Sequence, residues 1–353
     1  MTEETLVLTH RVHSQVLEAL EPHVRVVSNQ TDESLSRAEL LDRLGDATGV
    51  VVFPPDVVDA EFLAHAPLLR VVSGAFTGSD NIDVRSAAER GVTCSNVPDL
   101  LADATAELAV TLLLGLARRI REGDRMVRSS EFGGWSSRLL GTGLSGARVG
   151  LVGAGQVGRA VAKRLTGFGV TLSYADPRAV PPTEAKALGL ERMMLDALLE
   201  QSDMVVVCAP LTAESRGLFD RSRLGLMRPG ALLVNVARGS IVDEEAVAAS
   251  IASNHLGGYA ADVFAFEDGG FQKHTPAPAG SPTSQTGIPE ALLALEQRTL
   301  FTPHLGSSVT DARFAIEMRA AENAVLLLRG EEVTDVLFPR PEAELAGQPR
   351  KNR

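Results

Sequence analysis

Short aliphatic runs alternate with helix-like stretches along the first hundred residues. The runs are rich in Val or Leu and are bounded by polar residues, Gly or Pro, and they cover residues 5–9, 24–27, 49–53, 70–73 and 92–94. Between them, residues 14–20 and 36–44 carry apolar side chains at helical spacing. Continuous apolar strands that alternate with helices indicate a parallel sheet covered on both faces.

A second series of the same kind begins near residue 149. Its predicted strands cover residues 149–152, 171–174, 204–208, 232–236, 259–263 and 300–302. Six strands in alternation with helices are typical of a dinucleotide-binding domain. Residues 307–329 return to a helical pattern, and the last fourteen residues form a polar tail.

One long helix is predicted over residues 101–128, between the two series. Its first half is apolar nearly all round, which predicts burial at a domain or subunit interface; the residues are Leu101, Leu108, Val110, Leu112, Leu113, Leu114 and Leu116. Its second half mixes Arg with Glu122 and Asp124, and we interpret it as a solvated face with ion pairs rather than an anion site.

The segment 269–289 departs from this pattern, because Gly, Pro, Ser and Thr dominate it and no apolar period remains. A loop of this length in a compact domain is usually functional or disordered. The composition favours a mobile surface insertion, and an ordered lid is the alternative.

Charge and cysteine content narrow the class of protein. The 353 residues carry a net charge of −11, which disfavours nucleic acid and anionic membranes as partners, so an anionic substrate needs a local basic site. Cys94 and Cys208 are too few for a disulfide framework. The acidic start at residues 1–4 does not look like a signal peptide, and no apolar run is long enough for a membrane span. We therefore expect a cytoplasmic protein, and no His/Cys cluster has the spacing of metal ligands.

The glycine-rich segment Gly153-Ala154-Gly155-Gln156-Val157-Gly158 lies between a predicted strand and a predicted helix. In that context Gly153 permits a tight turn, Gly155 lets the backbone approach a pyrophosphate, and Gly158 lets the helix pack on the strand. Free N–H groups at the start of the helix, including those of Gln156 and Val157, then face the anion. A glycine turn without a nucleotide is the alternative, and the surrounding elements make it the weaker one.

Asp176 stands at the end of the next strand. A carboxylate there accepts hydrogen bonds from the adenosine ribose and repels a 2′-phosphate, so the sequence favours NAD over NADP. Arg178 lies two residues further on and could soften that preference.

Three chemically reactive side chains follow strands of the second series. Arg238, Glu267 and His304 each come after a predicted strand end, and in a doubly wound sheet these ends form the ligand crevice. An arginine binds an oxyanion, a histidine moves a proton, and a carboxylate bonded to the imidazole fixes its tautomer and favours its charged form. The alternatives are surface positions for the Arg and the Glu and a structural role for the histidine.

These motifs together resemble the D-2-hydroxyacid dehydrogenase family, through GAGQVG with Asp176, VNVARGSIVDE, ADVF with Glu267, and TPHLGSS. The resemblance implies that Arg238 binds the substrate anion and that His304 is the acid/base, with Glu267 as its partner. It implies that Asp262 holds the nicotinamide carboxamide. Residues implied to line the cofactor groove are Thr105, Cys208, Pro210, Val236, Ala237 and Gly306.

The family resemblance also implies the architecture. It consists of two doubly wound α/β lobes, a Rossmann cofactor domain over residues 101–304 and a smaller flavodoxin-like substrate domain over residues 1–100 plus 305–335, followed by a tail over 336–353. Members of the family are commonly homodimers, which would explain the apolar helix near Leu112 and an arm around Trp135.

Within the family, several segments look most like phosphonate (phosphite) dehydrogenases, among them LVLTHRVH, SNQTDESL and GGYAADVF. Arg313 and Ser307 match that subfamily. Thr77, Leu140 and Pro54 do not, since those enzymes carry Lys, Tyr and Met there. Thr77 with Gly78 offers a hydroxyl and backbone N–H groups in place of an ammonium, which suits a carboxylate.

We therefore expect an NAD-dependent dehydrogenase that transfers a hydride between nicotinamide and a small 2-hydroxy or 2-oxo acid. A phosphonate-bearing acid would reconcile the two signals. Oxidation of phosphite to phosphate is the alternative. An NADH-sensing corepressor without enzymatic activity is a remoter one, because the Arg238, Glu267 and His304 set is intact. A purely structural subunit would gain nothing from these motifs.

Overall fold

The computed structural model describes residues 4–268 and 287–338, and the chain divides into two compact units. The first unit is Met1–Leu100 with Thr310–Arg353, and the second is Leu101–Val309. The second boundary therefore lies five residues beyond the expected one, after Val309 rather than after His304. Most of the segment 269–289 and of the tail 336–353 lies outside the described residues, so the expectations for them stay predictions.

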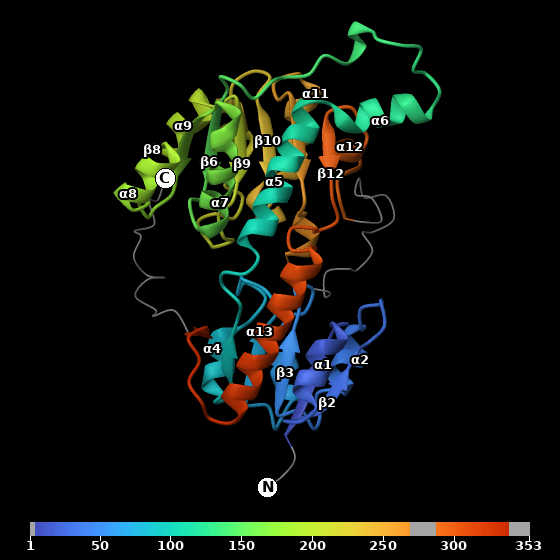
Figure 1. The fold of residues 1–353 in the computed structure, drawn as a ribbon, viewed down its shortest axis with the longest axis vertical. Coiled ribbons are helices and arrows are strands. Elements are labelled where there is room, and N and C mark those ends of the chain that lie inside the picture. Colours follow the sequence, from blue (N-terminus) through green and yellow to red (C-terminus); the bar gives the residue numbers. More distant parts are fainter. Residues whose placement is uncertain (1–3, 269–286, 339–353) are drawn as a thin grey trace, which may run out of the picture. The chain divides into compact units, whose positions relative to one another are not determined.

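The first unit, which contains β2 and β3 as labelled in Figure 1, is built on a six-stranded sheet in the order β13-β5-β4-β3-β1-β2. The pairings among β1 to β5 are all parallel, in the 2-1-3-4-5 order of flavodoxin-like folds, so the expected fold is confirmed. Helix α13 (Thr310–Leu328) returns from the far end of the chain to pack on this sheet. The other elements are β1 (Thr5–Leu8), α1 (Ser14–Leu20), β2 (Arg25–Ser28), α2 (Arg37–Asp42), β3 (Gly49–Val52), α3 (Ala60–His65), β4 (Val71–Gly74), α4 (Val84–Glu89), β5 (Thr93–Ser95) and β13 (Val336–Leu337).

Strand β13 was not expected. It pairs antiparallel with β5, so the first residues of the predicted tail form an edge strand of the sheet. Two apolar residues are too short a run to be distinguished from a loop in the sequence, and only the pairing with Cys94 and Ser95 defines the strand.

The second unit is built on a seven-stranded parallel sheet in the order β12-β11-β10-β9-β6-β7-β8. Counted from β6, this is the 3-2-1-4-5-6 order of a Rossmann fold with one further strand, which confirms the expected class. The strands are β6 (Arg148–Val152), β7 (Thr171–Ala175), β8 (Leu190–Arg192), β9 (Met204–Val207), β10 (Leu232–Asn235), β11 (Gly258–Ala261) and β12 (Thr299–Phe301). Strand β8 was not predicted, because two of its three residues, Glu191 and Arg192, are polar and exposed.

Helices cover both faces of this sheet, so successive strand residues are buried in opposite directions. Val206 packs into the core under α5, whereas Val205 and Val207 pack into the core on the other face. This two-sided burial explains why the strands read as unbroken apolar runs. The helices are α5 (Ala102–Ala117), α6 (Ile120–Arg128), α7 (Gln156–Leu165), α8 (Pro182–Leu188), α9 (Leu195–Gln201), α10 (Arg221–Leu226), α11 (Glu244–Ala252) and α12 (Glu290–Leu293), with 3₁₀ turns η1 (Ser137–Leu139), η2 (Thr166–Phe168), η3 (Gly239–Ile241) and η4 (Ala265–Glu267).

The helix predicted over 101–128 is in fact two helices. Arg119 adopts a left-handed conformation (φ 55°), and its guanidinium binds the Glu122 carboxylate at 2.6 and 2.8 Å. The chain therefore ends α5 and restarts as α6, which carries the expected polar face. Among the described residues no helix is long and apolar enough to cross a membrane.

Candidate functional site

The glycine-rich turn joins β6 to α7 beside the point where the strand order of the second sheet reverses. Gly153 has φ 95°, and a Cβ there would lie 2.6 Å from the backbone nitrogen of Ala209. A Cβ on Gly158 would lie 2.2 Å from the carbonyl oxygen of Gly153, so only glycine lets the helix approach the turn. These two glycines serve the fold of the turn itself.

Gly155 differs from these two glycines. Nothing lies within 4 Å of the Cβ it would carry, so the space above it is open. Gly155 is also the N-cap of α7, and no side chain caps the helix. An open surface in front of uncapped N–H groups is the arrangement that a pyrophosphate occupies, so the residues present fit a dinucleotide.

Asp176 lies directly after β7, beside this turn. One carboxylate oxygen accepts the N–H of Ala154 at 2.9 Å, and the other accepts the N–H of Arg178 at 2.8 Å. These bonds fix the carboxylate next to the glycines, where it can meet the ribose hydroxyls of an adenosine. The guanidinium of Arg192 donates to the carbonyl oxygens of Asp176 and Pro177, which further restrains the strand end.

Asp262, directly after β11, organises the loop that carries His304. Its side chain is buried and accepts hydrogen bonds from Thr302 Oγ1 (2.5 Å), Leu305 N (2.7 Å) and Gly306 N (2.8 Å). Burial raises the pKa of Asp262, and these bonds oppose the rise. Thr105 on α5 donates to the carbonyl oxygen of Gly306 at 3.2 Å, so two of the residues expected in the cofactor groove are in contact.

His304 and Glu267 form a direct pair. His304 Nδ1 lies 2.7 Å from one carboxylate oxygen of Glu267, and the other oxygen accepts the N–H of Phe264 at 2.6 Å. The carboxylate therefore assigns the proton to Nδ1 and leaves Nε2 as the nitrogen able to accept a proton. His304 also has φ 55°, a left-handed conformation that a non-glycine residue adopts at a cost and that clusters at functional sites.

Arg238 follows β10 and is half-buried. Asn235 shapes its loop: the Asn235 amide donates to the carbonyl oxygen of Arg238 at 2.9 Å and accepts the N–H of Ala237 at 3.0 Å. The next residue, Gly239, lies so close to the start of η4 that a Cβ would come within 1.8 Å of the Phe264 carbonyl carbon. The turn that carries Arg238 is thus packed against the turn that carries Glu267.

The other groove residues lie at neighbouring strand ends of the same edge. Val236 is buried and Ala237 half-buried after β10, and Cys208 and Pro210 follow β9. Burial raises the pKa of the Cys208 thiol to about 12, so Cys208 is a packing residue beside the glycine turn and not a nucleophile. Ser307 is half-buried three residues after His304.

The remaining expected substrate residues belong to the first unit, at the carboxyl edge of its sheet. The Thr77 hydroxyl donates to the carbonyl oxygen of Val97 at 2.9 Å, and Gly78 beside it is half-buried. Arg313 on α13 donates to the carbonyl oxygen of Ala75 at 3.3 Å, and burial lowers its pKa. The expected set is therefore divided between the two units.

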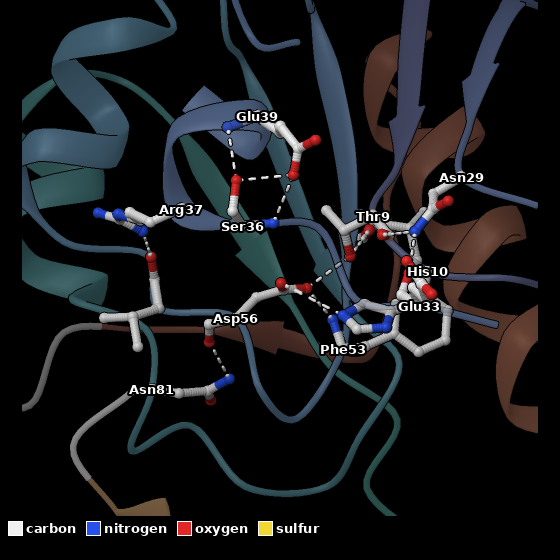
Figure 2. Close-up of polar contacts among 12 residues, drawn as sticks. Thr9, His10, Asn29, Glu33, Ser36, Arg37, Glu39, Phe53, Asp56 and Asn81 are labelled. Carbon is white, nitrogen blue, oxygen red and sulfur yellow. Dashed lines mark hydrogen bonds and ion pairs between the residues drawn. The ribbon is translucent and has the colours of Figure 1, made fainter. Parts of the chain in front are cut away.

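A buried carboxylate lies at the same edge of the first unit, and the sequence did not point to it. Figure 2 shows Asp56 with its carboxylate facing the ends of β1 and β3. It accepts the Thr9 hydroxyl at 2.5 Å and the N–H of Phe53 at 2.8 Å, and it lies 3.5 Å from His10 Nε2. These bonds link the residues that directly follow β1 and β3.

Two further residues of the second unit escaped the sequence interpretation. Glu244 at the start of α11 is only 6% exposed, although the run Asp243-Glu244-Glu245 is typical of a solvated helix start. Asp268 accepts the N–H of Ser240 at 2.5 Å. The sequence feature that could have identified both is their position, Glu244 shortly after Arg238 and Asp268 directly after Glu267. Within residues 4–268 and 287–338, no group of three or more His, Cys, Asp or Glu side chains could hold a metal ion.

The chain is similar to known proteins over most of its length. Residues 110–306 match the family model of the D-isomer specific 2-hydroxyacid dehydrogenase, NAD binding domain. A glyoxylate reductase of Thermococcus onnurineus is 35% identical over 334 residues, which are 92% of this chain and 93% of the relative. A D-3-phosphoglycerate dehydrogenase of Mycobacterium leprae is 38% identical over 302 residues, which are 85% of this chain and 53% of the relative.

The crystal structure of the TT0316 protein from Thermus thermophilus superimposes with a TM-score of 0.81 at 33% identity, over 95% of this chain and all of that one. An uncapped helix start at open Gly155, a carboxylate at Asp176 and a His304–Glu267 pair are consistent with these likenesses. The chain belongs to the D-isomer specific 2-hydroxyacid dehydrogenase family and is an NAD-dependent oxidoreductase.

Proposed function

We propose that this protein reduces a small 2-oxo acid with NADH, and oxidises the corresponding 2-hydroxy acid with NAD. The His304–Glu267 pair, at 2.7 Å beside the loop of Asp262, is the observation that carries the proposal. Relatives named glyoxylate reductase support an acid as small as glyoxylate.

The roles of the side chains follow from their chemistry. Arg238 binds the substrate carboxylate through its planar, permanently charged fork. His304 Nε2 donates a proton to the oxo oxygen in reduction and removes it from the hydroxyl in oxidation, while Glu267 stabilises the imidazolium. NAD, when bound, supplies the hydride acceptor or donor at nicotinamide C4. The glycine turn and Asp176 hold its pyrophosphate and ribose.

Phosphite oxidation is the second candidate, because Arg313 and Ser307 match the phosphonate dehydrogenase pattern. The Thr77 hydroxyl counts against it. That hydroxyl donates to Val97, so it offers a neutral oxygen where the subfamily has an ammonium. A charge-assisted hydrogen bond is roughly twice as strong as a neutral one, and a small dianion would lose most from the exchange. A phosphonate-bearing oxo acid remains a variant of the first candidate.

A substrate panel tests the choice. NADH consumption is measured with glyoxylate, pyruvate and phosphonopyruvate, and NAD reduction is measured with phosphite. We expect turnover with at least one oxo acid and little with phosphite, and Thr77→Lys should raise the phosphite rate relative to the parent. Rapid phosphite turnover by the parent would reverse the assignment. Binding of NADH without turnover of any substrate, together with an unchanged cellular role of His304→Ala, would favour the corepressor.

We further propose a cytoplasmic homodimer. Figure 1 shows the segment after α6 reaching out from the body of the second unit, and its large apolar side chains are exposed: Trp135 by 91%, Leu140 by 74% and Phe132 by 56%. Exposed aromatic groups gathered on one arm are typical of a protein interface. Light scattering after gel filtration is expected to give twice the mass of 37.4 kDa, and a monomer would contradict the proposal.

A further inference from the structure

Glu244 begins helix α11 but points into the protein rather than into solvent. One of its carboxyl oxygens accepts the N–H of Ala265 at 2.8 Å. Its neighbour Glu245 is exposed, and Asp243 caps the helix through the N–H of Ala246. Asp243 therefore caps the helix. Capping does not explain why the carboxyl of the next residue, Glu244, is buried. The acidic start of α11 is thus already provided by Asp243 and Glu245, and the buried position of Glu244 needs another explanation.

Ala265 is the first residue of η4, the single turn that carries Glu267. The turn is short, and Glu267 closes it by accepting the N–H of Phe264 with the oxygen that does not face His304. The bond from Ala265 to Glu244 fixes the beginning of the turn, and the bond from Phe264 fixes its end. The direction in which Glu267 points therefore depends on both.

The same turn is fastened to the loop of Arg238. Asp268, directly after η4, accepts the N–H of Ser240, directly after Gly239. Gly239 itself touches the Phe264 backbone. Glu244 lies a few residues after that loop, at the start of α11. Its bond with Ala265 therefore links α11 to the turn of Glu267, which is packed against the turn of Arg238.

The surroundings of Glu244 are apolar and acidic. Burial is the largest cause that raises the pKa of Glu244; the bond from Ala265 lowers it, the carboxylates of Asp268, Glu267 and Asp243 raise it, and the result is about 7. Burial raises the pKa of the Tyr259 phenol on β11, and the charge of Glu244 adds to that rise. A glutamine keeps a carbonyl acceptor but carries no charge, so it separates the bond to Ala265 from the charge of the carboxylate.

We propose that Glu244 is a positioning residue: by accepting the Ala265 N–H it holds η4 so that Glu267 faces Nδ1 of His304. The inference rests on the proposed function for its catalytic consequence, but not for its structural one. Losing the acceptor would leave the Ala265 N–H without this bond and release the start of the turn. The imidazole would then no longer be confined to one tautomer.

The experiment compares Glu244→Ala and Glu244→Gln with the parent, with Glu245→Gln as the matched control on the same helix. The holoenzyme with NADH is used throughout. Nitrogen NMR of the imidazole, assigned through His304→Ala, reports the tautomer under mildly alkaline conditions, and kcat and KM are measured with NADH and glyoxylate. Glu267→Gln provides the reference spectrum for an imidazole without its carboxylate.

For Glu244→Ala we expect mixed tautomers and a kcat lower by about 10–100-fold with KM changed only a few-fold, because a small misplacement in a proton-transfer site is costly. Glu244→Gln should keep the single tautomer and a kcat within about threefold of the parent, because the acceptor is retained. Glu245→Gln should match the parent.

A parent-like tautomer in Glu244→Ala would overturn the proposal. Mixed tautomers in Glu244→Gln would also overturn it, because the charge of Glu244, and not its bond with Ala265, would then confine the His304 imidazole to one tautomer. If Glu244→Ala does not fold, Glu244→Leu takes its place, because leucine fills a similar volume without offering an acceptor to the Ala265 N–H. A parent enzyme without glyoxylate turnover would reject the proposed substrate, whereas the NMR comparison would still test Glu244.

Discussion

Replacing Glu244 by glutamine should change how the stability of the protein depends on pH. Burial among three other carboxylates moves the pKa of this carboxyl from 4.5 to about 7 in the folded protein. The unfolded chain has the ordinary value. Between these two values the unfolded chain releases a proton that the folded chain keeps, so the free energy of unfolding falls as the pH rises.

The magnitude follows from the gap between the two values. Each pH unit corresponds to about 1.4 kcal/mol, so Glu244 costs the parent up to about 3 kcal/mol of stability between about pH 4.5 and about pH 7. Glu244 is 6% exposed, so solvent screens little of this amount. The glutamine variant has no such proton. Its stability relative to the parent should therefore rise over this range and level off above about pH 7.

Denaturant unfolding of both proteins, followed by circular dichroism at several pH values across this range, measures the difference. Other titrating groups are common to both and cancel. Glu245→Gln, on the same helix but exposed, should show a nearly constant difference from the parent. A constant difference for Glu244→Gln as well would refute the reasoning, because it would mean that Glu244 is ionised equally in both states.

Further predictions concern the cofactor and the proton. His304→Ala should abolish turnover while NADH affinity, measured by fluorescence titration, stays within a few-fold, because the histidine moves protons; unchanged turnover would remove it from the mechanism. Asp176→Ala should raise the NADP-to-NAD ratio of kcat/KM, because it removes the carboxylate that repels a 2′-phosphate, and an unmoved ratio would assign selection elsewhere. Gly155→Ala should keep the melting temperature but weaken NADH binding, since its Cβ enters the open space in front of the turn. Gly158→Ala should lower both the melting temperature and NADH affinity, since its Cβ would meet the Gly153 carbonyl oxygen at 2.2 Å. Equal melting temperatures for these two variants would contradict the packing argument.

The sequence predicted the sheets because their strands are buried on both faces. A run such as Met204–Val207 has no polar position to confuse it with a surface element. Strand β8 was missed for the opposite reason, since Glu191 and Arg192 are exposed at the edge of the sheet. The break at Arg119 could not be predicted either, because an ion pair with Glu122 and a left-handed residue leave no apolar signature.

The candidate site was predictable where chemistry follows strand ends. Arg238, Glu267 and His304 stand at such ends, and the structure brings Glu267 and His304 into contact. The contacts that hold them were not predictable, because they are made through backbone N–H groups. Glu244 reaches Ala265, Asp268 reaches Ser240 and Asp262 reaches Gly306, and none of these contacts has a spacing that a sequence displays. A buried glutamate beside two other acids contradicts the usual interpretation of an acidic run.

Reduction of an oxo acid is tested most directly by the product formed from glyoxylate and NADH in which both hydrogens at nicotinamide C4 are deuterium. We expect glycolate with one deuterium on C2, formed in step with NAD by the parent and not by His304→Ala. Absence of glycolate, with NAD reduced by phosphite instead, would contradict it.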